Sequence, residues 1–149
     1  MEKYFRTEEG ERVNIVEHTL QQIEKWPNLT IRIGTDSQNY SGITRYVTAI
    51  VYRYGNRGAH YIFFKEEVPR IKSEWNRLYD EGVRTVLAAD LIISEIPIAV
   101  EALEFDYNDA RKTLSSQLVD VFKNWGTFKS VFKSGDMLAC KAADHICRK

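Results

Sequence analysis

Residues 29–38 read LTIRIGTDSQ, and this stretch decides the fold. Apolar and polar residues alternate from residue 29 to residue 33, which is the two-residue period of a strand with one buried face. Polar residues follow soon afterwards, so we expect the strand to end there, with Asp36 at its carboxyl end. In α/β sheets, ligands bind beyond the carboxyl ends of the strands. Asp36 is therefore the first candidate functional residue.

Two more strands are predicted directly downstream. Residues 46–52 (YVTAIVY) are rich in β-branched and aromatic side chains, which favour strands. The sequence GNRG at 55–58 is typical of a turn, and residues 59–64 predict a returning strand. The three strands together predict an antiparallel meander.

The rest of the chain predicts helices and strands that alternate around this meander. Upstream, a stripe of apolar residues at helical spacing covers about 11–26 and stops at Pro27. Downstream we expect a long helix over about 71–96, a strand over 98–105, a helix over about 109–125, a strand over 128–132 and a helix over 136–149. This order indicates one α/β domain over residues 1–149, with a mixed five-stranded sheet flanked by helices.

The composition limits the classes of function. The 21 basic and 21 acidic residues cancel, whereas domains that bind nucleic acid over their whole surface are usually strongly basic. Local binding of nucleic acid stays open. No run approaches the roughly 20 apolar residues of a membrane span, and the N-terminus lacks a signal-peptide pattern. We therefore expect a cytoplasmic protein without a membrane partner.

Four acidic residues are candidates for one site because of their positions in this order of strands and helices. Asp36 and Asp106 follow strands that we expect to be parallel neighbours, so both carboxylates can reach one mouth of the sheet. Glu81 in the long helix and Asp144 in the last helix can flank that mouth. Carboxylates gathered in one place repel each other, and a hard divalent cation such as Mg²⁺ or Mn²⁺ relieves the repulsion.

The stretch IGTDSQ at 33–38, LEFD at 103–106 and the segment 133–144 resemble the YkuK family of predicted ribonuclease-H-like proteins. The resemblance covers nearly the whole chain after the first helix. It implies a ribonuclease-H fold and a nuclease that hydrolyses phosphodiester bonds in RNA, DNA or a hybrid by a two-metal-ion mechanism. The catalytic residues and ligands of Mg²⁺ or Mn²⁺ that it implies are Asp36, Glu81, Asp106 and Asp144.

One departure from the family concerns the last acid. The family often has Lys-Pro-acid before the final helix, whereas here Lys133 is followed by SGD, so Asp136 competes with Asp144 for the fourth position. Lys133 and Lys141 lie in a segment with a local surplus of positive charge. Together with Gln38, they are expected to contact the nucleic acid.

Each candidate also has a plain structural interpretation. An Asp at a strand end commonly bonds the nearby backbone and starts a turn, which applies to Asp36 and Asp106. Glu81 lies in a helix rich in charged residues and can be an ordinary exposed side chain. The alternative function is accordingly a catalytically inactive ribonuclease-H-like module that binds nucleic acid or serves as a scaffold.

Overall fold

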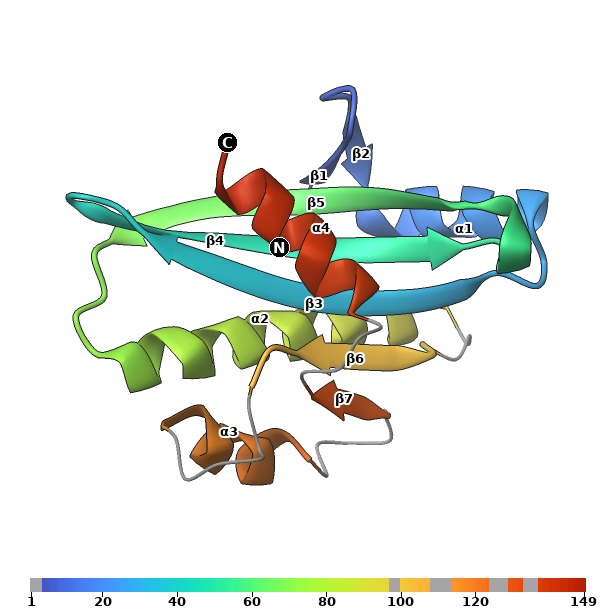
Figure 1. Cartoon of the computed structure of the whole chain (residues 1–149). Coiled ribbons are helices and arrows are strands. Elements are labelled where there is room, and N and C mark those ends of the chain that lie inside the picture. The colour runs from blue at the N-terminus through green and yellow to red at the C-terminus, as the bar shows by residue number, and fades with distance from the viewer. Residues whose placement is uncertain (1–3, 97–99, 108–113, 124–128, 133–136) are drawn as a thin grey trace.

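The computed structural model of the chain describes residues 4–96, 100–107, 114–123, 129–132 and 137–149, and the statements below refer to these residues (Figure 1). Two residues of the sequence-based site, Lys133 and Asp136, lie outside them. Within the described ranges, no helix combines the length and the apolar character that crossing a membrane requires.

A mixed sheet forms the centre of the molecule. Its seven described strands lie in the order β2-β1-β5-β4-β3-β6-β7. They are β1 (Tyr4–Thr7), β2 (Arg12–Asn14), β3 (Thr30–Asn39), β4 (Ile43–Arg53), β5 (Ala59–Pro69), β6 (Ala102–Phe105) and β7 (Ser130–Phe132). The meander of β3, β4 and β5 is antiparallel, as the sequence predicts. Strand β6 pairs in parallel with β3, and β7 pairs in parallel with β6, so the expected parallel neighbours are confirmed.

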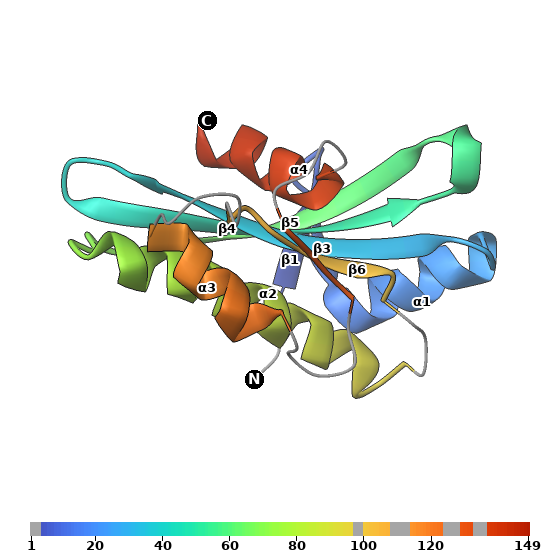
Figure 2. The same cartoon turned by 60° about the horizontal axis from the view of Figure 1, so that its bottom comes forward.

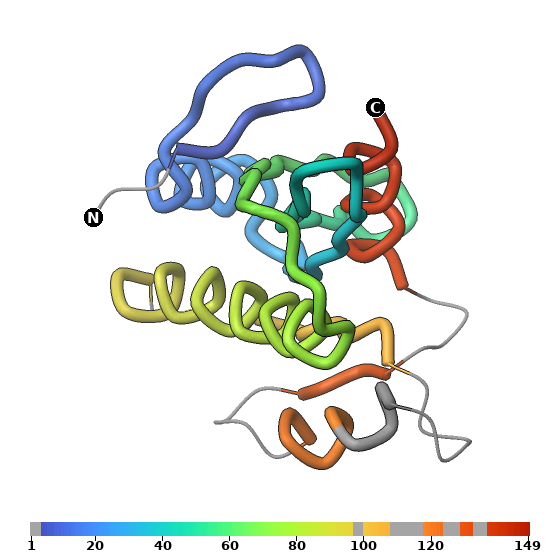
Figure 3. Tube along the Cα trace, turned by 90° about the vertical axis from the view of Figure 1, so that its left-hand side faces the viewer, coloured from blue at the N-terminus to red at the C-terminus, as the bar shows by residue number. Residues whose placement is uncertain are grey.

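Helices cover both faces of the sheet. They are α1 (Ile15–Lys25), α2 (Glu74–Ile93), α3 (Leu114–Phe122) and α4 (Leu138–Cys147). Helix α4 lies on one face, and α1, α2 and α3 lie on the other (Figure 2). Figure 3 shows the same division from the side: the red α4 lies opposite the blue α1 and the yellow-green α2.

The prediction of five strands is wrong, because the N-terminal segment adds the hairpin of β1 and β2. Strand β1 pairs with β5 through Arg6 and Thr7, far along the sequence, and this non-local pairing leaves no strong local pattern. The first helix consequently begins at Ile15 and not near residue 11. The side chain of Asn14 accepts the backbone N–H groups of Val16 and Glu17 at 3.0 and 3.1 Å, which caps the helix.

The prediction that Asp36 ends its strand is also wrong. Strand β3 continues to Asn39 because β4 pairs with it along its whole length, from Thr30 opposite Arg53 to Asn39 opposite Thr44. Antiparallel pairing satisfies the backbone of polar residues as well as apolar ones. Asp36 is therefore held inside a strand, in a fixed register.

The two faces of the sheet enclose two separate apolar clusters. The larger cluster lies between the sheet and the helices α1, α2 and α3, and it includes Ile31 and Ile33 of β3. The smaller cluster lies beneath α4 and consists of Val47, Ala49, Ala143, Ile146 and Cys147. Since side chains alternate between the faces of a strand, Arg32, Gly34 and Asp36 belong to the face under α4.

Candidate active site

The site begins where the pairing of β3 with β6 stops. Strand β6 pairs with β3 opposite Arg32, Ile33 and Gly34, and within the described ranges it pairs no further along. Beyond that point Asp36 lies on the face under α4, and Ser37 on the face under α2. Side chains from both faces can therefore meet around this open edge of β3.

Helix α4 brings Asp144 to Asp36. Burial, together with the hydrogen bond and the charge of Asp144, raises the pKa of Asp36 to about 7, against the opposing backbone N–H of Ser37. The protonated form of Asp36 is thereby favoured. The charge of Asp106 adds to the rise. Asp144 also forms an ion pair with Arg148 at 2.8 Å on the exposed side of α4.

Helix α2 brings Glu81 to the same edge from the other face. The side chain is only 4% exposed, so the interpretation of Glu81 as an exposed helical residue is wrong. The hydroxyl of Ser37 donates to Glu81, and Nη1 of Arg77 donates to that hydroxyl at 2.7 Å and lies 3.7 Å from Oε2 of Glu81. Burial raises the pKa of Glu81 well above its ordinary value, and the charges of Asp36 and Asp106 act in the same direction.

The beginning of α4 is fixed by a residue that the sequence analysis did not single out. Oε1 of Glu104 in β6 accepts the backbone N–H groups of Ala139 and Cys140 at 2.8 and 3.0 Å, where the positive end of the helix dipole lies. Nε of Arg32 lies 2.7 Å from Oε2 of the same carboxylate, and both side chains are buried. A charged residue within each otherwise apolar strand segment was the signal that could have revealed this pair.

Gly34 explains why α4 can approach so closely. A Cβ atom at this position would lie 2.8 Å from Sγ and 2.9 Å from the backbone nitrogen of Cys140. Both distances are shorter than real Cβ contacts allow. The glycine of the IGTDSQ stretch therefore has a packing role, because it lets the first turn of α4 rest on β3.

The end of α4 is fixed by hydrogen bonds to its last carbonyl groups. The hydroxyl of Tyr40 donates to the carbonyl oxygen of Cys147 at 2.6 Å. The guanidinium of Arg45 donates to the carbonyl oxygens of Cys147 and Lys149 at 3.0 and 2.9 Å. A cation at the C-terminal end complements the helix dipole. With both ends held, the position of Asp144 against Asp36 is determined by the fold.

The remaining candidate residues are Asp106, Gln38 and Lys141, which lie after β6, on β3 and on α4. Asp106 directly follows β6 and is exposed, and its charge acts on both Asp36 and Glu81. Gln38 is half-buried on β3, two residues beyond Asp36 and on the same face of the strand. Lys141 is exposed on α4. The four predicted acids thus belong to one electrostatically linked group, with Asp144 as the hydrogen-bonded partner of Asp36.

The carboxylate groups of the site are of the chemical type that binds a hard divalent cation. Carboxylate oxygens are the ligands that Mg²⁺ and Mn²⁺ take, and mutual repulsion raises the pKa values of Asp36 and Glu81 in the way that a cation would reverse. As the described side chains lie, no three acidic, histidine or cysteine groups already converge into a metal-binding group. The protonated form of Asp36 is favoured as the side chains lie, and Asp106 is exposed beside it.

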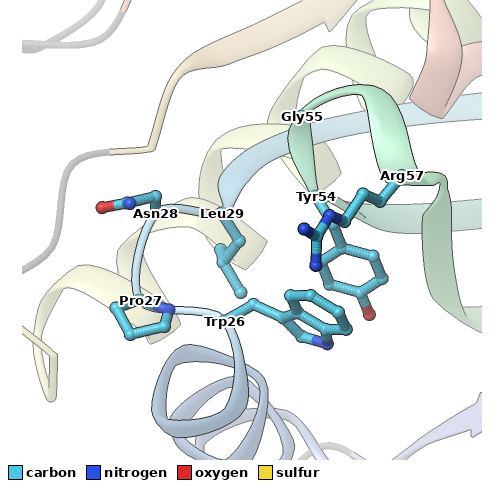
Figure 4. Close-up of a pocket in the computed structure, with 7 residues that line it drawn as sticks. All are labelled: Trp26, Pro27, Asn28, Leu29, Tyr54, Gly55 and Arg57. Carbon is cyan, nitrogen blue, oxygen red and sulfur yellow. The ribbon is translucent and has the colours of Figure 1, made fainter.

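A cavity of about 230 Å³ lies elsewhere, at the opposite end of β3 (Figure 4). The rings of Trp26 and Tyr54 stack there with centroids 4.9 Å apart, and Arg57 and Leu29 complete the wall with their neighbours. Leu29 directly precedes β3, whereas Asp36 lies towards its other end. The cavity therefore does not belong to the acidic site.

The arrangement defines a class of protein. Three antiparallel strands followed by two parallel ones, with helices on both faces, are the arrangement that the sequence analysis expects of a ribonuclease-H-like domain. A family model described as ribonuclease H-like, that of the YkuK family, matches residues 13–148, so the chain belongs to this family. A search of curated proteins finds no match.

Proposed function

We propose that the protein is a metal-dependent nuclease that hydrolyses phosphodiester bonds in RNA, DNA or a hybrid. One observation carries the proposal. Acidic side chains from four separate elements act on one another at the open edge of β3, where the fold alone gives no reason to gather them. Sites of this kind are costly for stability, and proteins keep them where function requires them.

In this proposal Asp36, Asp144, Glu81 and Asp106 hold Mg²⁺ or Mn²⁺. The bound ions would supply an activated water and neutralise the charge that develops on the phosphate. Asp36, whose pKa is raised to about 7, would give up its proton on binding, because a carboxylate must be ionised to act as a ligand. The two anchored ends of α4 keep Asp144 in reach of Asp36 during this exchange.

The residues around Glu81 have a positioning role in the proposal. Ser37 and Arg77 hold its buried carboxyl group in one orientation through the hydroxyl and the guanidinium. Gln38 lies on the face of β3 under α4, and Lys141 is exposed on α4 itself; both would contact the backbone of the nucleic acid. Since the net charge is zero, binding would depend on such local contacts.

The proposal is tested by incubating purified protein with single-stranded, duplex and hybrid substrates in Mn²⁺ or Mg²⁺. Cleavage should require the metal and stop with EDTA. Asp36→Asn should reduce cleavage to background, because it replaces a carboxylate ligand with a neutral amide. The matched control is Asp90→Asn, which changes an exposed Asp of α2 outside the acidic group and should cleave like the wild type.

The same preparations decide between the nuclease and the inactive module. If wild-type protein binds nucleic acid in a filter assay but cleaves no substrate with either metal, the binding module is the correct description. If Asp36→Asn cleaves as fast as wild type, the acidic group is not the active site. For Lys141→Gln we expect weaker binding and a salt dependence reduced by about one phosphate contact.

A further inference from the structure

Two histidines form a close pair far from the acidic site. Nε2 of His18 in α1 lies 2.8 Å from Nε2 of His60 in β5. The side chain of His18 is buried and that of His60 is half-buried. The two residues come from separate elements, so their approach results from the packing of α1 on the sheet.

The surroundings hold both rings in place. Tyr52 packs edge-on against His18 and stacks on His60, with ring centroids 5.6 and 5.9 Å apart. The hydroxyl of Tyr52 is already engaged with Thr19 at 2.6 Å, so it does not bond the imidazoles. The charges of Glu8 and Glu9 in the turn between β1 and β2 act on His60. The pair is therefore packed against an aromatic ring and lies near enough to two carboxylates to be affected by their charge.

Both imidazoles are neutral at neutral pH. Burial, together with the charge of His60, lowers the pKa of His18 to about 4. Burial also lowers the pKa of His60. A neutral imidazole has one ring nitrogen with a lone pair, and this is the form that binds transition metals. The two Nε2 atoms lie 2.8 Å apart. An opening of the pair to roughly 3.3 Å, the separation of two nitrogens that each lie about 2.0–2.1 Å from one tetrahedral ion, would let both bind the same metal.

We propose that His18 and His60 form a binding site for a borderline divalent cation such as Zn²⁺, which links α1 to β5. Imidazole suits Zn²⁺, Ni²⁺ and Cu²⁺, whereas the carboxylates of the nuclease site suit Mg²⁺ and Mn²⁺. Two nitrogens supply half of a tetrahedral shell. Water completes it, with Glu8 or Glu9 available on the open side, because no third ligand stands in place among the described residues.

The site is independent of the nuclease proposal in position and in chemistry. His60 directly follows the first residue of β5 and pairs with Tyr52 near the end of β4. Asp36 pairs with Val47, which precedes Tyr52 on β4 by five residues and lies on the opposite face of the sheet. An ion at the histidine pair consequently stabilises the packing of α1 without reaching the acidic group.

The test uses the untagged full chain, titrated with Zn²⁺ and separately with Mg²⁺. Zn²⁺ should bind in calorimetry and raise the Tm, because an ion that binds the folded state stabilises it. His18→Gln and His60→Gln should each lose the Zn²⁺-dependent shift. His145→Gln, which changes the third histidine of the chain on the exposed side of α4, should keep it. Asp36→Asn should keep it too, which separates this site from the nuclease site.

Unmodified protein supplies a second measurement, in case a histidine variant fails to fold. Substoichiometric Cu²⁺ should broaden the imidazole NMR signals of His18 and His60 before that of His145. Absence of a Zn²⁺-dependent Tm shift in wild type would overturn the proposal. So would a shift that persists in His60→Gln, or copper broadening that begins at His145.

Discussion

The two faces of the sheet achieve their packing by different means. Beneath α1, α2 and α3, large apolar side chains such as Ile31, Ile33 and Leu103 interlock with the helices in a continuous core. Beneath α4, the apolar contribution comes from small residues such as Ala49 and Ala143. The face with the larger apolar cluster therefore holds its helices by apolar burial. The face with the smaller cluster needs additional interactions to hold α4.

Polar interactions add to the stabilisation of α4 by the smaller apolar cluster. Glu104 binds the first turn of α4, and Arg45 with Tyr40 binds the last. Such contacts are directional, so they fix the helix in one place and one rotation. Directional polar contacts at its two ends therefore fix the position of α4 more than apolar burial does. This suits a helix that holds Asp144 in the proposed site.

The largest expected effect concerns the buried pair that anchors α4. Arg32→Met leaves the carboxylate of Glu104 buried without its cation, and we expect a loss of about 3–5 kcal/mol in the free energy of unfolding. Urea denaturation measures this loss. Arg148→Met removes an exposed ion pair of similar length and should change stability far less.

A second variant sharpens this prediction. Adding Glu104→Gln to Arg32→Met should recover much of the loss, because a neutral amide oxygen still accepts the N–H groups of Ala139 and Cys140 and needs no cation. If the double variant is no more stable than the single one, charge is not what holds the anchor.

On the opposite face, the histidine pair makes stability depend on pH. The pKa of His18 is about 4 in the folded protein, below its ordinary value of 6.5, so the unfolded chain takes up a proton first. The contribution of neutral His18 is complete above pH 6.5 and is lost as the pH falls towards 4, with a total of about 2–3 kcal/mol.

The measurement is urea denaturation between pH 4 and 7 in the presence of EDTA. His18→Gln removes the titrating ring, so the difference in stability between wild type and variant should shrink as the pH falls. A difference that stays constant over this range would mean that His18 is not held neutral by the fold.

The sequence predicted the regular parts of the fold because their patterns are local. The alternation at residues 29–33 and the β-branched run at 46–52 gave the meander, and helical spacing gave α2. Strands β1 and β2 escaped prediction because four and three residues leave little pattern. Their pairing with β5 is a tertiary effect that the local sequence does not encode.

The candidate site was predictable only as residue types. The element order placed Asp36 and Asp106 on neighbouring strands and put Glu81 and Asp144 in helices that can flank them, while the family resemblance supplied the roles of all four as ligands. The contacts of Glu104 and Arg32 link residues far apart in sequence, and their pairing depends on strand register. A charged residue in an apolar strand indicates that it has a buried partner, but the sequence does not show which residue the partner is.

Gly34 tests how closely α4 must approach the sheet. Gly34→Ala places a methyl group against the backbone nitrogen of Cys140, which cannot move aside without shifting the first turn of α4. We expect a loss of about 1–3 kcal/mol in stability. Gly42→Ala is the matched control, since nothing lies within 4 Å of a Cβ atom there. Equal stabilities for the two variants would show that α4 is not confined by this contact.

The smallest expected effect is a gain in stability at the site itself. In Asp36→Asn, the side-chain amide can donate permanently to Asp144, and the repulsion among the buried carboxyl groups falls. We expect the variant to be more stable than wild type by roughly 1 kcal/mol at pH 7 in EDTA, and to lack the proposed nuclease activity. Urea denaturation measures the gain, and Asp90→Asn should show none.

Metal should reduce this difference in stability. Mn²⁺ should stabilise wild type and leave Asp36→Asn nearly unchanged, because the variant lacks a carboxylate ligand, so the gap between the two should narrow as the metal concentration rises. A variant that is less stable than wild type in EDTA would identify Asp36 as a structural residue. In that case the face under α4 would be organised for stability throughout, and the contrast between the two faces would no longer point to an active site.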